Sequence, residues 1–330
     1  MRNAVILSSG MHVPERVVSN REFDEMLGEN VSAWLEQTAQ IFERRWCSES
    51  EAASDLAVQA AQQALDRAGV PAAEVDLIIL ATDTPDFVSP PTASVVQHRL
   101  GAARAGIFDL NAACAGFVTG LHLGASYLRA QRRLRHVLVI GTYAMSKFLN
   151  LKDKKTVTLF ADGAGAVLLG AADTDEDSGY LAGTLSAMGQ YHDGMGIYAG
   201  GTRFPATPER LEAGEHLLRF VYKFPADLNQ REWTRIIREL CAESGHTPEE
   251  IQHYVITQIN IGSIRATMEA LSLPPERACT VMHRYGYTGS ACIPMAFHEA
   301  VESGRIRRGD LVQFIGSGGG LAFAGAAFRY

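Results

Sequence analysis

The sequence has few of the features that mark secreted, metal-binding or membrane proteins. It contains five cysteines in 330 residues, with no CxxC pair and no regular spacing between them. An odd number of cysteines without a pairing pattern argues against a disulfide framework, and no His/Cys spacing indicates a metal site. No apolar run reaches membrane-spanning length, and the start MRNAVILSSGMHVP has too short an apolar stretch for a signal peptide. We therefore expect a soluble cytoplasmic protein with no membrane association.

The chain also lacks a large excess of positive or negative charge. The formal net charge is −7, and no block of like charges occurs along the chain. The only basic cluster, RAQRRLR over 129–135, is typical of a helix C-terminus, where cations are favoured, so we do not expect nucleic-acid binding. What the chain does contain is apolar residues, 47% of the total, which is enough for two ordinary domains or one duplicated unit.

The first third of the chain predicts alternating strands and helices. A strand is expected over 4–9, and two short helices over 20–28 and 31–39. A long amphipathic helix follows over about 54–68, with small apolar residues on one face. The apolar run over 75–81 is typical of a strand buried on both faces of a parallel sheet.

A repeated pattern relates the two halves of the sequence. RAGVPAAEVDLIILAT (67–82) and ESGHTPEEIQHYVITQ (243–258) match without a gap, at an offset of 176 residues. The same offset relates 110–122 to 286–298 and, to within one residue, 136–141 to 311–316, while 160–170 and 317–328 are each predicted as strand–turn–strand. Several correspondences of this kind indicate an internal duplication.

The predicted fold is therefore α/β, with two duplicated βαβ halves whose mixed, mainly parallel sheets are layered between helices. We place the halves at 1–172 and 173–330. Within the second half, residues 186–232 are rich in Gly, Tyr and His and are expected to form a long inserted loop.

Cys114 lies where the strand end DLN meets an apolar helix in the sequence DLNAACAGF (109–117). Small neighbours let another backbone or a substrate approach closely. A thiol at a helix N-terminus faces unpaired N–H groups and the positive end of the helix dipole, so we expect thiolate to be favoured. The alternative for a cysteine taken alone is a small buried hydrophobic residue.

Taken together, these motifs resemble the thiolase fold and, within it, the 3-oxoacyl-ACP synthase III (ketoacyl synthase III) family. The resemblance covers nearly the whole chain. It rests on an N-terminal strand with a Pro turn, Trp34, PTASVVQHRLG (91–101), the DLNAACAGF elbow, LFADGAGAVLL (159–169) and the C-terminal SGGGLAFAGAAFRY (317–330).

The resemblance implies that Cys114 accepts an acyl group from a CoA or acyl-carrier-protein thioester. The backbone N–H groups of Cys114 and Gly319 would form the oxyanion hole, which suits a glycine run because no side chain blocks the amides. Trp34, Phe87, Asn260 and Gly318 are the expected substrate-binding residues. No cofactor is expected, since the acyl-CoA or acyl-carrier protein is a substrate. SGGG lacks the Gly-Lys-Ser/Thr ending of a phosphate-binding loop, so we do not expect it to bind nucleotide phosphates. The family also implies a homodimer, with the region around 91–101 near the twofold axis.

The second half departs from the family at two positions. The family's catalytic histidine, in His-Gln-Ala-Asn, is replaced by Thr257 in TQIN, and its asparagine, in Gly-Asn-Thr, is replaced by Tyr287 in GYT. In the family these two groups hold the malonyl thioester while carbon dioxide leaves. A threonine hydroxyl is neither an acid nor a base near neutral pH. Ordinary decarboxylative elongation should therefore be nearly abolished.

Three replacements remain open. Tyr287 either supplies a phenolic donor or fills the malonyl site with its bulk. A histidine from elsewhere, namely His98, His192 or His283, is the second possibility, although each is more often a surface or core residue. The third is a second substrate that brings its own nucleophile, so that the new bond is C–C, C–O or C–N.

The donor side departs as well. Trp34 matches the family residue that packs on the CoA adenine, but the arginine expected four positions later is Thr38. Gly262 replaces an arginine used toward the carrier protein, and Arg265 is close enough in sequence to compensate. Phe87 would lie at the acyl tunnel, although a core position is equally compatible with its sequence context.

We therefore expect a ketoacyl synthase III-like acyltransferase that passes an acyl group from Cys114 to a second substrate, in specialised metabolite or fatty-acid-related biosynthesis. One alternative is a non-catalytic partner subunit of a heterodimeric ketosynthase. The other is an ordinary 3-oxoacyl-ACP synthase III with a relocated base. The sequence does not identify the acyl donor or the acceptor.

Overall fold

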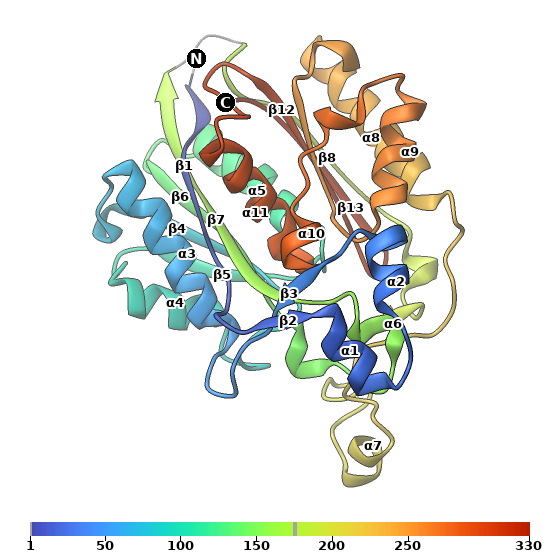
Figure 1. Ribbon diagram of the computed structural model, residues 1–330. Coiled ribbons are helices and arrows are strands. Elements are labelled where there is room, and N and C mark those ends of the chain that lie inside the picture. Colours follow the sequence, from blue (N-terminus) through green and yellow to red (C-terminus); the bar gives the residue numbers. More distant parts are fainter. Residues whose placement is uncertain (1, 174–176) are drawn as a thin grey trace.

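The first half of the chain forms a five-stranded mixed sheet. The computed structural model describes residues 2–173 and 177–330, and its first sheet has the order β1-β7-β6-β4-β5 (Figure 1). Strand β4 (Leu77–Ala81) lies between β5 (Gly106–Leu110) and β6 (His136–Ala144) and is parallel to both. The antiparallel strands β7 (Asp162–Asp173) and β1 (Arg2–His12) follow on the other side.

The second half repeats this arrangement in a four-stranded sheet. Its order is β11-β12-β13-β8, with β11 parallel to β12 and the other pairs antiparallel. The strands are β11 (His253–Ile256), β12 (Leu311–Gly318), β13 (Ala322–Arg329) and β8 (Gly179–Ala187). A single bridge between Tyr254 and Ala278 takes the place of β5. The internal duplication and the mixed sheets expected from the sequence are thus confirmed. The expectation that the sheets are mainly parallel was wrong, because three of the seven strand pairs in these two sheets are parallel and four are antiparallel.

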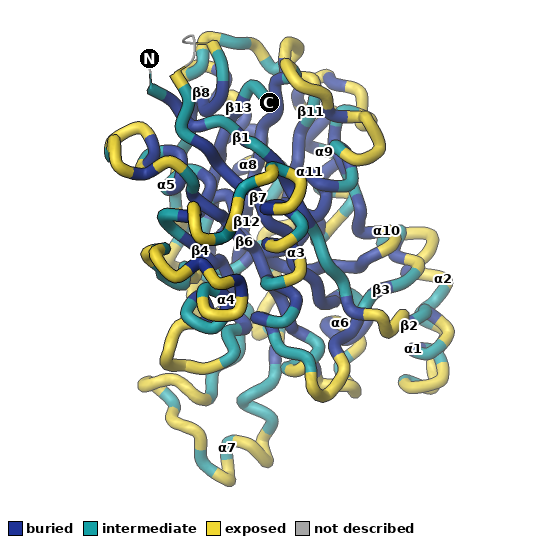
Figure 2. Tube along the Cα trace, turned by 90° about the vertical axis from the view of Figure 1, so that its left-hand side faces the viewer, coloured by how far each residue is buried: buried dark blue, intermediate teal, exposed yellow. Residues whose placement is uncertain are grey.

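Helices separate and cover the two sheets. The central pair is α5 (Gly116–Ala130) and α11 (Cys292–Glu302), the outer pair on the first sheet is α3 (Ala53–Ala68) and α4 (Thr92–Leu100), and the outer pair on the second sheet is α8 (Leu228–Ser244) and α9 (Ile261–Ala270). The helix α5 carries no charged residue before its last turn, as expected for a helix buried on all sides. The dark central layers of Figure 2 are these strands and the two central helices.

The predicted N-terminal elements are present. Helix α1 (Asn20–Leu27) begins at a capping box in which Ser19 and Glu22 bond to each other's backbone. The helix expected over 31–39 is α2 (Ser32–Trp34) continued by a π-helical turn. Four short elements complete the description: β2 (Val17–Ser19), β3 (Glu43–Arg45), α6 (Lys154–Val157) and α10 (Met282–Tyr285).

The strand–turn–strand predicted for the first copy of the repeat was wrong. The strand–turn–strand predicted over 160–170 is one continuous strand, β7, because its small residues pair without interruption with β1 and β6. Strand–turn–strand is correct only for the second copy, where β12 and β13 are joined by a tight turn.

The inserted segment is shorter and more ordered than 186–232. Strand β8 extends to Ala187 and α8 already begins at Leu228. Between them lie the paired strands β9 (Met195–Gly196) and β10 (Arg219–Phe220) and the short helix α7 (Pro208–Glu212). Helix α7 projects from the body of the molecule (Figures 1 and 2).

Candidate active site

Cys114 lies in a tight turn between β5 and α5. Ala113 has a positive φ of 46°, a strained value for a residue with a Cβ. The turn is closed by the Ala115 amide, which donates to the Ala112 carbonyl at 3.1 Å, and by the Asn111 side chain, which accepts from the Ala113 amide at 3.0 Å. Helix α5 begins two residues after the cysteine, as the sequence predicted. The fold therefore fixes Cys114 at the start of a central helix, between the two sheets.

The electrostatics of Cys114 differ from the expectation. Its side chain is only 2% exposed, and burial raises the pKa of the thiol well above its usual value because a thiolate loses its hydration. The negative charge of Asp83 raises this pKa further, whereas a hydrogen bond with Tyr287 lowers it. The expectation that the helix start would favour thiolate is therefore wrong for the free protein. Burial is the larger effect, so a proton acceptor is needed for nucleophilic attack.

Tyr287 occupies the asparagine position beside this sulfur. Its backbone is fixed to the loop before β7: its amide donates to the Leu159 carbonyl at 2.8 Å, and its carbonyl accepts from Ala161 at 2.9 Å. Its ring packs against Phe160 with centroids 5.3 Å apart, and its hydroxyl is hydrogen-bonded to the Cys114 sulfur. The phenol is a hydrogen-bond donor to the sulfur and also a bulky group beside it. Its position is therefore compatible with a role as a donor and with a role in filling the malonyl site.

Thr257, at the histidine position, is completely buried. Its hydroxyl accepts a hydrogen bond from the Ser317 amide at 2.8 Å and donates to the Ser317 carbonyl at 3.4 Å. These bonds join the end of β11 to β12. The hydroxyl is thus engaged by the neighbouring strand.

The glycine run at the end of β12 touches the cysteine turn. A Cβ added to Gly318 would lie 2.7 Å from the Cys114 amide nitrogen and 2.6 Å from the Ala112 carbonyl oxygen. Glycine is required there because both neighbours are backbone atoms. A Cβ on Gly319 would lie 3.2 Å from the flexible end of Met195 and 3.7 Å from its carbonyl oxygen, which is an ordinary contact. The proximity expected from the sequence is present, and the role of the Gly319 amide as an oxyanion donor stays a prediction.

The histidines considered as replacements lie elsewhere. His98 is in the last turn of α4, His192 is in the inserted segment, and His283 is in α10. All three are exposed, whereas Cys114 is buried between the sheets. None of them is positioned to serve that sulfur in this structure.

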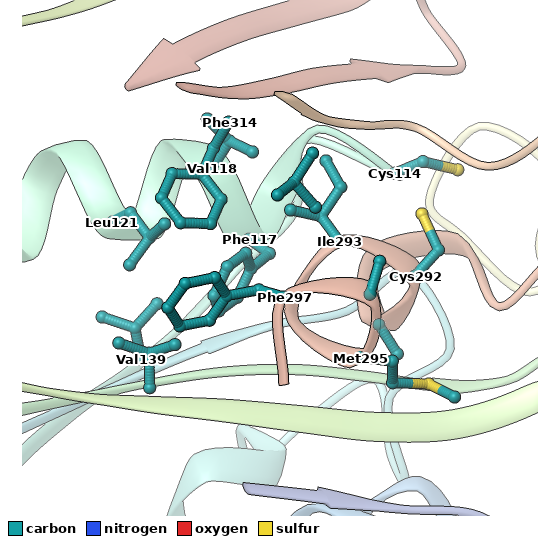
Figure 3. Packing of buried hydrophobic residues seen from close by; sticks show 14 of the residues in the cluster. Cys114, Phe117, Val118, Leu121, Val139, Cys292, Ile293, Met295, Phe297 and Phe314 are labelled. Carbon is teal, nitrogen blue, oxygen red and sulfur yellow. The ribbon is translucent and has the colours of Figure 1, made fainter. Parts of the chain in front are cut away.

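Three residues that we did not single out from the sequence surround Cys114. The charges of Asp83, Tyr143 and Cys292 all influence the titration of the site. Cys292 begins α11, and Figure 3 shows its side chain directed toward Cys114. One signal was available for Asp83: it follows the buried run 77–81, and the carboxyl ends of parallel strands are where sites form.

Two cavities border the region expected to hold the donor. Trp34, half-exposed, lines a cavity of about 290 Å³ together with Val31, Lys154 and Lys155. Asn260 lines a second cavity of about 490 Å³, which Lys155 also borders. Within this cavity wall, Asn260 caps α9 through its side-chain oxygen, which accepts from the Gly262 and Ser263 amides.

Phe87 lies in the loop after β4 and is 54% exposed, so it is not a core residue of this chain. The adjacent Val88 is exposed as well. Strand β5, at the edge of the first sheet, has one side without a strand partner among the described residues. The acyl-tunnel role of Phe87 and the homodimer remain predictions.

Within residues 2–173 and 177–330, no group of three or more His, Cys, Asp or Glu side chains is arranged to hold a metal ion. None of the helices described is both long and apolar enough to cross a bilayer.

A buried cysteine between two duplicated halves, with a glycine turn against its backbone, defines a thiolase-type acyltransferase. Comparison with known proteins identifies the family within this class. Family models described as 3-oxoacyl-[acyl-carrier-protein] synthase III and its C-terminal part match residues 108–189 and 241–330. The chain belongs to the 3-oxoacyl-[acyl-carrier-protein] synthase III family, whose members are acyl-transferring, condensing enzymes.

Individual relatives align over the whole chain. The beta-ketoacyl-[acyl-carrier-protein] synthase III of Roseiflexus sp. (strain RS-1) is 41% identical, over 99% of this chain and 98% of its own length. The crystal structure of the synthase III from Pseudomonas aeruginosa matches with a TM-score of 0.89 at 32% identity, covering 99% and 98% of the two chains. A priming β-ketosynthase from the R1128 polyketide pathway matches with a TM-score of 0.87 at 28% identity, covering 99% and 96%.

Proposed function

We propose that this protein takes an acyl group from a CoA or acyl-carrier-protein thioester onto Cys114 and transfers it to a second substrate without histidine- and asparagine-assisted decarboxylation. The observation that carries the proposal is the combination at the site. The cysteine turn and its Gly318 contact are intact, whereas Thr257 is engaged with Ser317 and Tyr287 stands beside the sulfur. A specialised pathway is supported by the similarity to the R1128 priming ketosynthase.

The first half-reaction is nucleophilic acyl transfer. The Cys114 sulfur attacks the thioester carbonyl, and the carbonyl oxygen becomes an oxyanion that the backbone amides of Cys114 and Gly319 are suited to stabilise. Collapse of this intermediate releases the donor's thiol and leaves a thioester on Cys114. Because burial raises the pKa of Cys114, the sulfur must lose its proton as the donor binds.

Intact-protein mass tests the proposal. Incubation with acetyl-CoA or with acetyl-carrier protein should add one acetyl mass to the wild type and none to Cys114→Ala. Cys292→Ala is the matched control, because Cys292 is a second cysteine that is completely buried in the same site. It should acylate like the wild type. The absence of any adduct on the wild type, or an equal adduct on Cys114→Ala, would refute the proposal.

The CoA end of the donor is proposed to lie in the cavity beside Trp34. An exposed indole offers a stacking surface for an adenine ring, and Lys155 offers a cation between this cavity and the next. The missing arginine at Thr38 leaves Trp34 as the main stacking partner. Arg265, considered as a compensating carrier-protein contact, donates to the Gln40 side chain at 2.8 Å.

Trp34→Ala should raise the acetyl-CoA concentration needed for half-maximal acylation by about tenfold, because stacking of one base contributes about 1–3 kcal/mol. The measurement is the acylation rate as a function of acetyl-CoA concentration. Phe42→Ala is the control, since Phe42 is 52% exposed, against 50% for Trp34, and does not line the cavity. Equal effects in the two variants would contradict this placement of the donor.

The second candidate is a non-catalytic partner subunit of a heterodimeric ketosynthase. The raised pKa of Cys114 and the engaged Thr257 hydroxyl favour it. It predicts no adduct in the mass experiment and copurification with an active homologue. Ordinary ketoacyl synthesis instead requires carbon dioxide release from malonyl-carrier protein, which we expect to be absent.

A further inference from the structure

Asp83 stands out among the residues around Cys114 because the proposed function leaves it without a role. It lies just beyond the carboxyl end of β4, where the sheet register places Ala81 opposite Leu110 of β5 and Gly141 of β6. Two residues further along these three strands come Asp83, Ala112 of the cysteine turn and Tyr143. The fold thus brings a carboxyl group to the edge of the sheet at which Cys114 is held.

The surroundings of Asp83 keep its side chain at this edge. The Thr82 amide donates to the Leu110 carbonyl at 3.1 Å, and the Ala144 amide donates to the Thr84 hydroxyl at 2.9 Å. These bonds fix the chain on both sides of Asp83 to the neighbouring strands. The negative charge of Asp83 raises the pKa of the Cys114 thiol and of the Tyr143 phenol, in agreement with the strand register that brings these residues to one edge of the sheet.

One oxygen of this carboxyl is buried and unused. Asp83 Oδ1 is shielded from solvent and has no hydrogen-bond partner in the part of the chain that the structure describes. A buried acceptor without a partner is costly and indicates a group that binds something else. Asp162, the other carboxyl near Tyr143, is different, because its oxygens accept from the Cys47 amide and from the amide and hydroxyl of Ser146. Of these two carboxyl groups, Asp83 is the one with an oxygen available for a proton from a substrate.

We propose that Asp83 is the general base of this site and that the acyl acceptor is a hydroxyl or amine. This inference rests on the proposed function. The acceptor oxygen or nitrogen attacks the carbonyl carbon of acyl-Cys114, and its proton passes to the Asp83 carboxylate. The C–S bond then breaks, and the departing sulfur takes the proton from Asp83. The products are an ester or amide, a free thiol and a carboxylate ready for another turnover.

The same proton path serves the formation of acyl-Cys114. There Asp83 accepts the thiol proton, which resolves the difficulty created by burial of the sulfur, and returns it to the leaving donor thiol. A decarboxylating malonyl group makes its carbanion by losing carbon dioxide and has no proton to give. A carboxylate base is therefore suited to an acceptor that carries an O–H or N–H bond.

The test follows loss of the acetyl group from acetyl-Cys114 by mass, after acetyl-CoA has been removed. Water and added ethanol are the hydroxyl probes. Asp83→Asn should slow both hydrolysis and ethyl acetate formation about 10²–10⁴-fold, the usual contribution of a positioned base. Asp86→Asn is the matched control in the same loop: Asp86 accepts from the Ser54 amide, which asparagine can also do, and its rate should be unchanged.

The pH profile of the wild type gives a second readout that does not require a variant to fold. Burial raises the pKa of Asp83 to about 6, while the pKa values of the neighbouring Cys114 and Tyr143 are raised further from neutrality. Deacylation should rise through about pH 6 to a plateau, and Asp83→Asn should abolish this step. A flat wild-type profile between pH 5 and 8, or normal deacylation in a folded Asp83→Asn, would overturn the inference while leaving acylation of Cys114 intact. Failure of the wild type to acylate at all would instead refute the proposed function.

Discussion

Gly318→Ala should reduce acylation of Cys114 by at least about 100-fold. The added methyl group would lie 2.6 Å from the Ala112 carbonyl oxygen and 2.7 Å from the Cys114 amide nitrogen. Both are backbone atoms of the strained turn that holds the nucleophile, so neither can rotate away as a side chain would. The turn must shift, and displacement of reacting atoms by about 1 Å commonly costs about 10²-fold in rate. Overpacking of this kind also destabilises a protein by about 1–3 kcal/mol.

The adjacent glycine provides a matched control. In Gly319→Ala the new methyl group would lie 3.2 Å from the Met195 Cε, the mobile end of a flexible side chain, and 3.7 Å from the Met195 carbonyl oxygen, an ordinary contact distance. The backbone amide expected to contact the oxyanion is retained in both variants. The two variants are compared by single-turnover acylation with acetyl-CoA, measured by intact-protein mass. Thermal unfolding of each variant reports its stability. Similar acylation rates for Gly318→Ala and the wild type would show that the glycine run does not hold Cys114 in place.

Much of the fold is readable from the sequence because duplication leaves its signal twice. The match between residues 67–82 and 243–258 predicted two related sheets, and β4 and β11 occupy equivalent places in them. The cysteine turn was also predictable, since small residues between a strand and an apolar helix favour a tight bend or a close backbone approach. The boundaries of β7 and of the inserted segment were not, because small residues such as those of DGAGA are equally compatible with a turn and with a buried strand.

The electrostatics of the site depend on contacts between distant segments. The helix start predicted a thiolate at Cys114, but the two sheets that enclose the sulfur remove the water on which a thiolate depends. The residues next to Cys114 in the sequence indicate that a helix begins there, but they do not indicate that the two sheets bury the sulfur. Thr257 illustrates the same point: its position relative to the family motif was readable, whereas its bonds to Ser317 arise from the pairing of β11 with β12.

Tyr287→Phe should slow alkylation of Cys114 by about 10- to 100-fold at pH 8. The Tyr287 hydroxyl is hydrogen-bonded to the sulfur and lowers the pKa of the thiol, against the larger effects of burial and Asp83. Removing the hydroxyl raises this pKa further, so less thiolate is present at any pH below it. A hydrogen bond to a charged group contributes about 1.5–3 kcal/mol, which corresponds to the expected range. Alkylation by iodoacetamide, measured from pH 7 to 10, reports the thiolate directly.

Tyr254→Phe is the control for this experiment. Tyr254 is also completely buried, but its hydroxyl donates to the Pro248 carbonyl at 2.7 Å, in the second sheet's outer layer. Its loss should leave the alkylation profile of Cys114 unchanged. If Tyr287→Phe instead alkylates as fast as the wild type, the phenol acts through its bulk alone. In that case its ring against Phe160 only closes the space where a malonyl group would have bound, and Asp83 becomes the sole polar side chain proposed to assist the sulfur.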